Sequence, residues 1–141
     1  MIRDFRDSDM TDVLRIWLDA SVRAHDFVDG RFWQSRVSDM KETYIPASET
    51  YICEDEEGIK GFFSLCENTL AAMFVAPKHQ GEGIGRKLIQ KAKELRRELE
   101  LSVYKDNGRA VRFYEMCGFR CVAERIDECT GHPELMMKSG S

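Results

Sequence analysis

Long apolar segments are missing from this chain. The longest purely apolar run covers residues 70–76, which is far short of the roughly 20 residues that a membrane-spanning helix needs. The N-terminal residues contain no apolar region of the kind that a secretory signal has. These two absences predict a soluble, cytoplasmic protein without a membrane partner.

The cysteines show no pattern of a disulfide framework or a zinc site. Their total of five is odd, and no two of them form a C-x-x-C pair. Disulfide frameworks use an even number of cysteines, and structural zinc sites use such pairs. We therefore expect reduced thiols and no metal site. The five residues are Cys53, Cys66, Cys117, Cys121 and Cys129.

A basic stripe is missing as well. The formal net charge is −4, and acidic and basic residues are interspersed along the chain. Proteins that bind the phosphate backbone of nucleic acids gather lysine and arginine on one face. We therefore expect no nucleic-acid partner.

Nothing in the sequence divides the chain into parts. It has no repeat, no low-complexity tract and no linker rich in proline, glycine or serine. A length of 141 residues with 43% hydrophobic residues is typical of one domain. We expect a single domain over residues 1–138 and a flexible tail over residues 139–141. The oligomeric state stays open between a monomer and a homodimer.

The first third of the chain predicts two helices after a short strand at residues 2–5. Ser8 or Asp9 can cap the first helix, and residues 31–44 have the apolar spacing of the second. The expected inward residues are Val13, Leu14, Trp17 and Leu18 in the first helix and Phe32, Val37, Met40 and Tyr44 in the second.

The remainder predicts a mixed α/β (α+β) fold with a mostly antiparallel sheet flanked by helices. A helix is indicated by an apolar stripe, and another by residues 109–117, which Gly118 closes. The stripe consists of Ile84, Leu88, Ala92, Leu95 and Leu99. Strands are expected at residues 51–54, 59–65, 69–75, 101–104, 119–124 and 135–138.

A glycine-rich stretch lies between an expected strand and an expected helix. Gly81, Gly83 and Gly85 occupy alternate positions there. Glycines let the backbone approach a ligand closely, and the first turn of a helix offers unpaired N–H groups and a positive dipole end. The stretch therefore predicts an anion site, although a turn without a ligand is the plainer alternative.

Two well-known phosphate loops do not fit this spacing. The P-loop would need glycine at Arg86 and a serine or threonine at Leu88. The dinucleotide fingerprint would need glycine at one of these same two positions. Both motifs therefore fail.

The pattern that does fit is Q-x-x-G-x-G, in residues 80–85. It resembles the loop with which the GCN5-related N-acetyltransferase (GNAT) family wraps the pyrophosphate of acetyl-coenzyme A. Residues 107–119 resemble that family's second motif, N-x-x-A-x-x-F-Y-x-x-x-G-F. The likeness covers essentially the whole chain, and residues 25–27 and 70–78 are most similar to the small bacterial YiaC-like and YjaB-like members. It implies a sheet that is splayed at the cofactor site.

The resemblance implies acetyl-coenzyme A as co-substrate and a role for each motif residue. Tyr114 would protonate the departing thiolate, and Asn107 would contact the cofactor arm. A backbone N–H of Phe74 or a neighbour would stabilise the oxyanion. The pantetheine arm would pair with Met73, Phe74 and Val75, and the diphosphate would bind the loop of Gln80, Gly81, Glu82, Gly83, Ile84, Gly85 and Arg86.

The general base is where the sequence departs from the family. Many members have a glutamate that would align at Thr69 or near Ser102, and neither residue is a carboxylate here. His25 has a suitable ordinary pKa, and Glu67 lies close to Thr69 in sequence. The candidates are therefore His25, Glu67 or a water relay. His79 and His132 are given no role.

The expected function is transfer of an acetyl group from acetyl-coenzyme A to a primary amine, with a protein lysine or N-terminus as candidate acceptors. The alternative is a non-catalytic module that senses acyl-coenzyme A. A thiol enzyme is a third class, but no local cysteine and histidine signature supports it. The acceptor itself cannot be read, because residues 20–29 and 131–135 are expected to form its pocket and loops vary freely.

Overall fold

The computed structural model describes residues 1–140 and centres on a seven-stranded sheet. All pairs of neighbouring strands are antiparallel except β4–β5, which is parallel, so the predicted mixed, mostly antiparallel sheet is confirmed. In spatial order the strands are β1 (Ile2–Asp4), β2 (Glu49–Asp55), β3 (Gly58–Cys66), β4 (Thr69–Val75), β5 (Leu99–Tyr104), β7 (Pro133–Ser139) and β6 (Arg120–Ile126).

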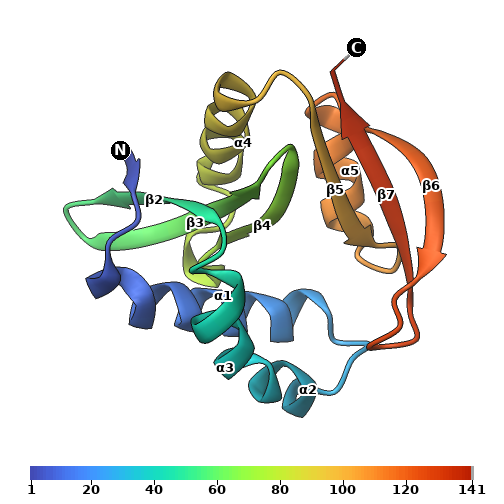
Figure 1. Cartoon of the computed structure of the whole chain (residues 1–141), viewed down its shortest axis with the longest axis horizontal. Coiled ribbons are helices and arrows are strands. Elements are labelled where there is room, and N and C mark those ends of the chain that lie inside the picture. Colours follow the sequence, from blue (N-terminus) through green and yellow to red (C-terminus); the bar gives the residue numbers. More distant parts are fainter. Residues whose placement is uncertain (141) are drawn as a thin grey trace.

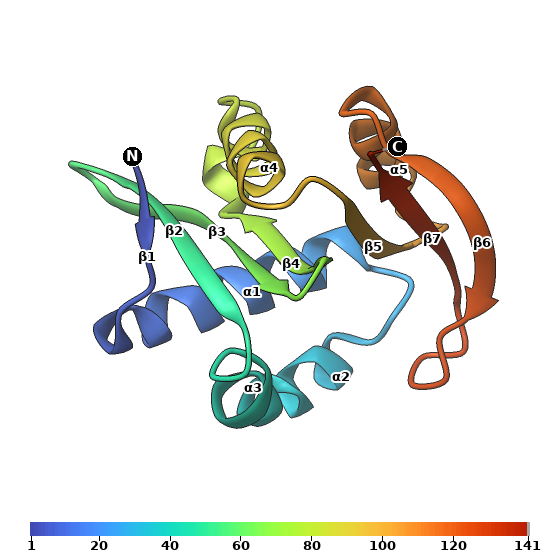
Figure 2. The ribbon, with the colours of Figure 1, turned by 45° about the horizontal axis from the view of Figure 1, so that its top comes forward.

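The sheet splits between β4 and β5. The two strands share a single register pair, Thr69 with Glu100, and then diverge (Figure 2). Within the described chain, β1 to β4 therefore form one half of the sheet and β5, β7 and β6 form the other. The expected splay is confirmed.

The helices cover both faces of the sheet (Figure 1). On one face of the first half lie α1 (Met10–Ala24), α2 (Gly30–Ser35) and α3 (Val37–Asp39). On the other face lies α4 (Ile84–Leu95), and α5 (Gly108–Met116) packs on the second half of the sheet. None of the helices in residues 1–140 is long and apolar enough to cross a membrane.

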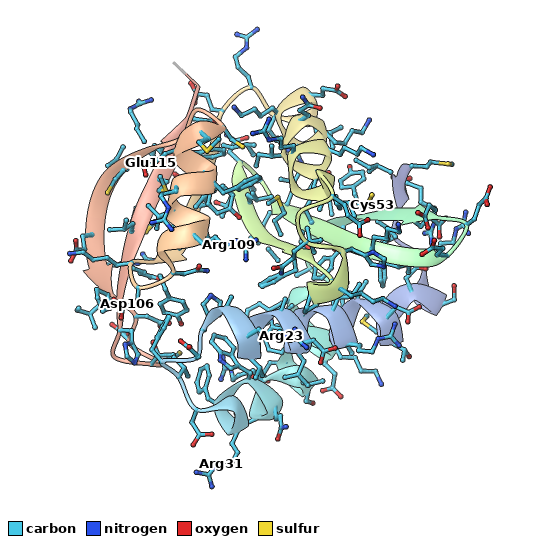
Figure 3. All side chains as sticks on the ribbon, turned by 180° about the vertical axis from the view of Figure 1, so that it is seen from behind. Arg23, Arg31, Cys53, Asp106, Arg109 and Glu115 are labelled. Atoms are coloured by element: carbon cyan, nitrogen blue, oxygen red, sulfur yellow. The ribbon has the colours of Figure 1, made fainter. Side chains whose placement is uncertain are left out.

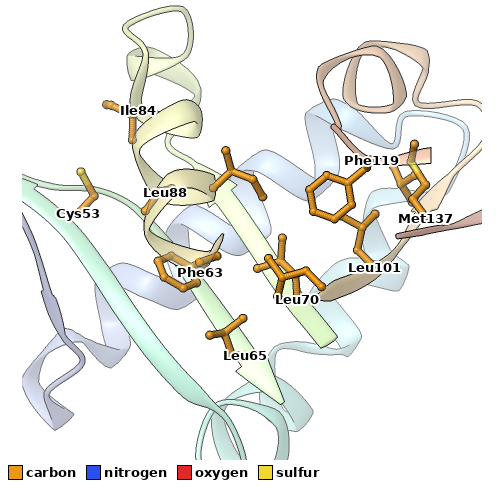
Figure 4. Packing of buried hydrophobic residues seen from close by; sticks show 13 residues of the cluster. Cys53, Phe63, Leu65, Leu70, Ile84, Leu88, Leu101, Phe119 and Met137 are labelled. Carbon is orange, nitrogen blue, oxygen red and sulfur yellow. The ribbon is translucent and has the colours of Figure 1, made fainter. Parts of the chain in front are cut away.

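One of the two hydrophobic cores bridges the split (Figure 4). Beneath α4 it joins Phe63 and Leu70 of the first half to Leu101, Phe119 and Met137 of the second. The two halves are thus held together by buried apolar area, although they share one strand pair only. The second core packs α1 and α2 against the opposite face of β2 and β3.

The first helix differs from the prediction in its cap and its inward face. Asp9 stands at the N-cap position, but its carboxylate accepts hydrogen bonds from the Arg3 guanidinium at 2.8 and 2.9 Å and from the Arg6 N–H at 2.8 Å. It therefore ties α1 to β1. The buried residues of α1 are Val13, Ile16, Trp17, Ala20 and Ser21, whereas Leu14 and Leu18 are only half-buried.

The predicted helix over residues 31–44 is wrong as one continuous α-helix. It is broken after α2, and a π-helical turn, Met40–Tyr44, follows α3. The Ile45 N–H donates to the Met40 carbonyl five residues earlier, so Ile45 is buried below Met40 and Tyr44 is 51% exposed. Trp33, rather than the half-buried Phe32, is the buried aromatic residue of α2.

Two predicted boundaries shift because of strand pairing. Leu99, expected at the end of the α4 stripe, pairs with Ser139 as the first residue of β5. That same pairing places Ser139 in β7, one residue beyond the predicted end of the strand at residues 135–138. Ser141 lies outside the described residues. The helix α5 ends at Met116, one residue before the predicted end, and Gly118 closes it as predicted, with a φ of 95°.

Candidate active site

A cleft of about 680 Å³ opens where β4 and β5 diverge. Its walls come from α1, α2, β4, the glycine-rich loop with the first turn of α4, β5, α5 and β7. It brings together most of the predicted site residues and leaves out Glu67 and Glu82. The predicted residues that line it are His25, Met73, Phe74, Val75, Gln80, Gly81, Gly83, Ile84, Gly85, Arg86, Asn107 and Tyr114.

The glycine-rich loop fits an anion. Gly81 and Gly83 have φ values of 87° and 83°, which side-chain-bearing residues rarely adopt. A methyl group at either position would meet no atom within 4 Å, so the loop borders open space. Gly83 is also the N-cap of α4, and the N–H groups of the first helical turn therefore face this space beside a positive dipole end.

The carboxylate of Glu82 is held away from this anion site. It lies 3.1 Å from Nδ1 of His79 and 3.5 Å from Nζ of Lys60. The hydrogen bond from the His79 ring, and then the nearby Lys60 ammonium, lower the pKa of Glu82. The carboxylate of Glu82 thus contacts the side chains of His79 and Lys60, and only the backbone of Glu82 is available to the loop's ligand.

Alternation along β4 decides which backbone groups face the cleft. Ala76 donates its N–H to Lys60 of the preceding strand, and the Phe74 carbonyl oxygen lies against Gly61 of β3. Successive residues of a strand direct their N–H and C=O groups to opposite sides. Met73 and Val75 therefore present their backbone to the gap, and the Val75 carbonyl accepts a hydrogen bond from Gln80 Nε2 at 3.3 Å. Of the predicted oxyanion donors, the neighbours of Phe74 fit and Phe74 itself does not.

Two arginines add positive charge to the cleft. Arg86 lies in the first turn of α4, and Arg109 lies in the first turn of α5, where it faces the gap between the two halves (Figure 3). Neither forms an ion pair with any residue in the described range. Both guanidinium groups are thus available to phosphate oxygens.

Tyr114 lies in α5 between two other aromatic rings. The centroids of the Phe113 and Phe119 rings are 5.4 and 5.6 Å from its own. Burial, with a smaller contribution from the Cys117 thiol, raises the pKa of Tyr114 well above its ordinary value. The phenol therefore keeps its proton at neutral pH, which a proton donor must do.

Asn107 connects α5 to the end of α1. Its Oδ1 accepts a hydrogen bond from the Ala110 N–H at 3.3 Å and so caps α5. Its Nδ2 lies 3.4 Å from Nε2 of His25. Asn107 therefore touches both the predicted cofactor side and the predicted acceptor side of the cleft.

His25 is a poor general base in this structure. It is 9% exposed, and the ring centroids of Phe27, Trp33 and Tyr104 lie 5.8, 5.1 and 5.0 Å from its own. Burial lowers the pKa of His25 to about 4, so its ring is neutral and weakly basic at neutral pH. The ordinary pKa of histidine, which made His25 a candidate base, is therefore not the pKa that this environment favours.

Glu67 lies away from the cleft. It is exposed at the turn between β3 and β4, where its φ of 53° reverses the chain, and its carbonyl accepts a hydrogen bond from Arg96 at 2.8 Å. This turn lies next to the only register pair of β4 and β5, at the closed end of the split. The structure does not bring Glu67 together with the other site residues.

Sequence reasoning missed Glu134, the one carboxylate among the cleft-lining residues of the described chain. It pairs with Tyr104 across β5 and β7 and lies diagonally from Ser102, where the family pattern led us to look for a glutamate. Arg125 links the two, donating to Glu134 Oε1 at 2.5 Å and to Ser102 Oγ at 3.4 Å. Only the strand register reveals this proximity, and nothing local in the sequence does.

The chain is similar to known acetyltransferases over most of its length. Residues 46–121 match the model of the acetyltransferase (GNAT) domain family. The peptidyl-lysine N-acetyltransferase YiaC of Escherichia coli K12 is 33% identical over 123 residues, which cover 86% of this chain and 84% of that protein. The peptidyl-lysine N-acetyltransferase YjaB of the same strain is 26% identical over 133 residues, which cover 94% of this chain and 90% of that protein.

Solved structures agree with these sequence matches. The solution structure of apo-form YjaB from Escherichia coli has a TM-score of 0.88 and 25% identity, over 100% of this chain and 98% of that one. The PaiA N-acetyltransferase from Thermoplasma acidophilum, solved in complex with coenzyme A, has a TM-score of 0.83 at 15% identity, over 100% and 98% of the two chains. The latter supports the fold alone.

The loop geometry predicts unequal effects of two neighbouring cations. Arg86→Gln should weaken acetyl-coenzyme A binding by roughly 10-fold, because it removes a charge-assisted contact to the diphosphate. Lys87→Gln is the matched control, since Lys87 does not line the cleft. Calorimetry at low and at physiological salt measures both. Equal losses in the two variants would mean that general charge, and not this site, attracts the cofactor.

The burial of His25 predicts a pH dependence of stability. The unfolded chain binds a proton near pH 6.5, but the folded chain does so only near pH 4. The contribution of the neutral His25 to the free energy of unfolding is therefore fully present above pH 6.5. It falls, by up to about 3 kcal/mol, as the pH drops from 6.5 to 4.

Urea unfolding between pH 4 and pH 7.5 measures this loss, and His25→Gln should flatten it. The pH profile of kcat/KM should show no ascending limb near pH 6.5 that depends on His25. A limb at that pH that disappears in His25→Gln would contradict the low pKa.

Proposed function

Since the chain belongs to the GNAT acetyltransferase family, we propose that its acceptor is an amine carried by a peptide, with a lysine side chain as the first candidate. Family membership makes the chain an N-acetyltransferase that uses acetyl-coenzyme A, and it argues against the non-catalytic sensor. The names of YiaC and YjaB support a lysine acceptor. The observation that supports transfer most is the cleft, in which an anion loop, a protonated tyrosine and one carboxylate meet.

The cofactor side of the cleft fits the parts of acetyl-coenzyme A in order. The N–H groups of the glycine-rich loop and the Arg86 guanidinium would hold the diphosphate. The backbone of Met73 and Val75, which faces the gap, would pair with the amides of the extended arm. The N–H of Met73 or Val75 would then stabilise the oxyanion that forms when the amine attacks the thioester.

The proton transfers require one base and one acid. Glu134 would hold the incoming ammonium and take its first proton, directly or through water. The neutral nitrogen then forms the amide bond as the carbon–sulfur bond breaks. Tyr114 would donate its proton to the leaving sulfur and recover one from the new amide nitrogen. Glu134 would release the first proton to solvent, so both residues would end the cycle as they began.

Tyr114→Phe tests the acid. The substitution keeps the ring that packs against Phe113 and Phe119 and removes only the hydroxyl. We expect kcat to fall by roughly 100-fold while the dissociation constant of acetyl-coenzyme A stays unchanged. Single-turnover measurements isolate the chemical step. A wild-type rate in that step would assign the proton to another donor.

Glu134→Gln tests the base. It removes the only carboxylate charge on the cleft wall of the described residues, so kcat/KM for a lysine peptide should fall by roughly 10- to 100-fold while cofactor binding is kept. Glu124→Gln is the control, because Glu124 lies on neighbouring β6, pairs with Lys105 and does not line the cleft. If both variants turn over like the wild type, water alone carries the proton.

A further inference from the structure

Three buried polar atoms in residues 1–140 have no hydrogen-bonding partner. They are Oγ of Ser21, Nδ1 of His25 and Nε1 of Trp33. The exposed fractions of these residues are 0%, 9% and 7%, and all three line the cleft described above. Buried polar groups are ordinarily paired, so three orphans on one cleft wall are unexpected.

The three side chains form one group at the end of α1 and the start of α2. Ser21 and His25 are four residues apart, so they lie on the same face of the helix, and the His25 N–H donates to the Ser21 carbonyl at 2.9 Å. The ring centroids of His25 and Trp33 are 5.1 Å apart. By contrast, the buried hydroxyl groups of Thr50 and Ser64 are joined by a hydrogen bond of 2.8 Å.

The chemistry of the group limits what it can bind. The indole N–H of Trp33 can only donate, and the Ser21 hydroxyl can donate as well, so the ligand must offer an acceptor atom. The two arginines of the cleft lie on α4 and α5, whereas aromatic rings surround this end. A carboxylate buried here would have no counter-charge, which makes an uncharged oxygen the better match.

We propose that Ser21, His25 and Trp33 form an acceptor subsite that hydrogen-bonds an uncharged carbonyl oxygen of the peptide carrying the reactive amine. The subsite rests on the proposed function, because it specifies which group of the peptide acceptor is bound. It favours an amine that is carried by a peptide over a free alkylamine. His25 is here a binding residue on the acceptor wall and not the base.

The test compares two amines that differ in their carbonyl groups. One is Nα-acetyl-lysine N-methylamide, and the other is pentylamine, which has the same kind of primary amine without any carbonyl. The wild type should prefer the lysine derivative in kcat/KM. The ratio of the two values should fall roughly 5- to 10-fold in Ser21→Ala and in Trp33→Phe, because each removes one hydrogen bond to the peptide.

Ser64→Ala is the matched control. It also removes a buried hydroxyl, but Ser64 does not line the cleft, so the ratio should stay at its wild-type value. Thermal unfolding gives a second readout that needs no substrate. Ser64→Ala leaves Thr50 without its partner and should lower Tm by roughly 3 °C or more, whereas Ser21→Ala removes an orphan and should not lower it.

The possible outcomes distinguish a failure of the subsite from a failure of the proposed function. A wild-type ratio in both Ser21→Ala and Trp33→Phe would overturn the subsite, because these atoms would then take no part in binding the acceptor. So would a lowered ratio in Ser64→Ala to the same extent. Absence of turnover with both amines, in a wild-type protein that binds acetyl-coenzyme A, would overturn the proposed function and the subsite with it.

Discussion

The parting of β4 from β5 is the constraint on which the rest of this structure depends. After one register pair, Thr69 with Glu100, the two strands diverge, and the backbone groups of Met73 and Val75 lose the partners that a continuous sheet would supply. Such a split exposes polar groups and is costly unless something holds the halves together. The core beneath α4 does so, because Leu101, Phe119 and Met137 of one half pack with Phe63 and Leu70 of the other. The cleft can therefore stay open while the protein stays folded.

Charge is distributed unevenly along this cleft, and the two ends suit different ligands. On the side of α4 and α5, Arg86 and Arg109 have no acidic partner in the described residues, and Lys60 and His79 hold the Glu82 carboxylate. At the α1–α2 end, aromatic rings surround a neutral His25. Such an arrangement suits an anionic ligand on one side and an uncharged one on the other, and Glu134 is the one carboxylate that lines the cleft in the described residues.

Local patterns predicted most of the fold. The glycine-rich loop with the helix that follows it, and the helix that Gly118 closes, depend on residues close in sequence, so the sequence alone was enough there. Predictions failed where the burial or the element of a residue depended on helix type or on strand register. The π-helical turn buries Ile45 and exposes Tyr44, and pairing with Ser139 brings Leu99 into β5. Neither the proximity of Glu134 to Ser102 nor the direction of the Phe74 backbone can be read without knowing which strands pair.

His25 shows how burial changes the role of a residue. Its type and position suggested a base, but a base must gain a proton during turnover, and the aromatic surroundings disfavour the charged ring. What the surroundings leave intact is hydrogen bonding by the neutral ring. Nε2 lies beside Asn107, which caps α5, and Nδ1 is buried without a partner in residues 1–140. A neutral imidazole in this place can orient an acceptor at one nitrogen while it contacts the cofactor side through the other, and titration at physiological pH would disturb both contacts. The low pKa is therefore consistent with a residue that orients other groups by hydrogen bonds and does not take up the proton itself.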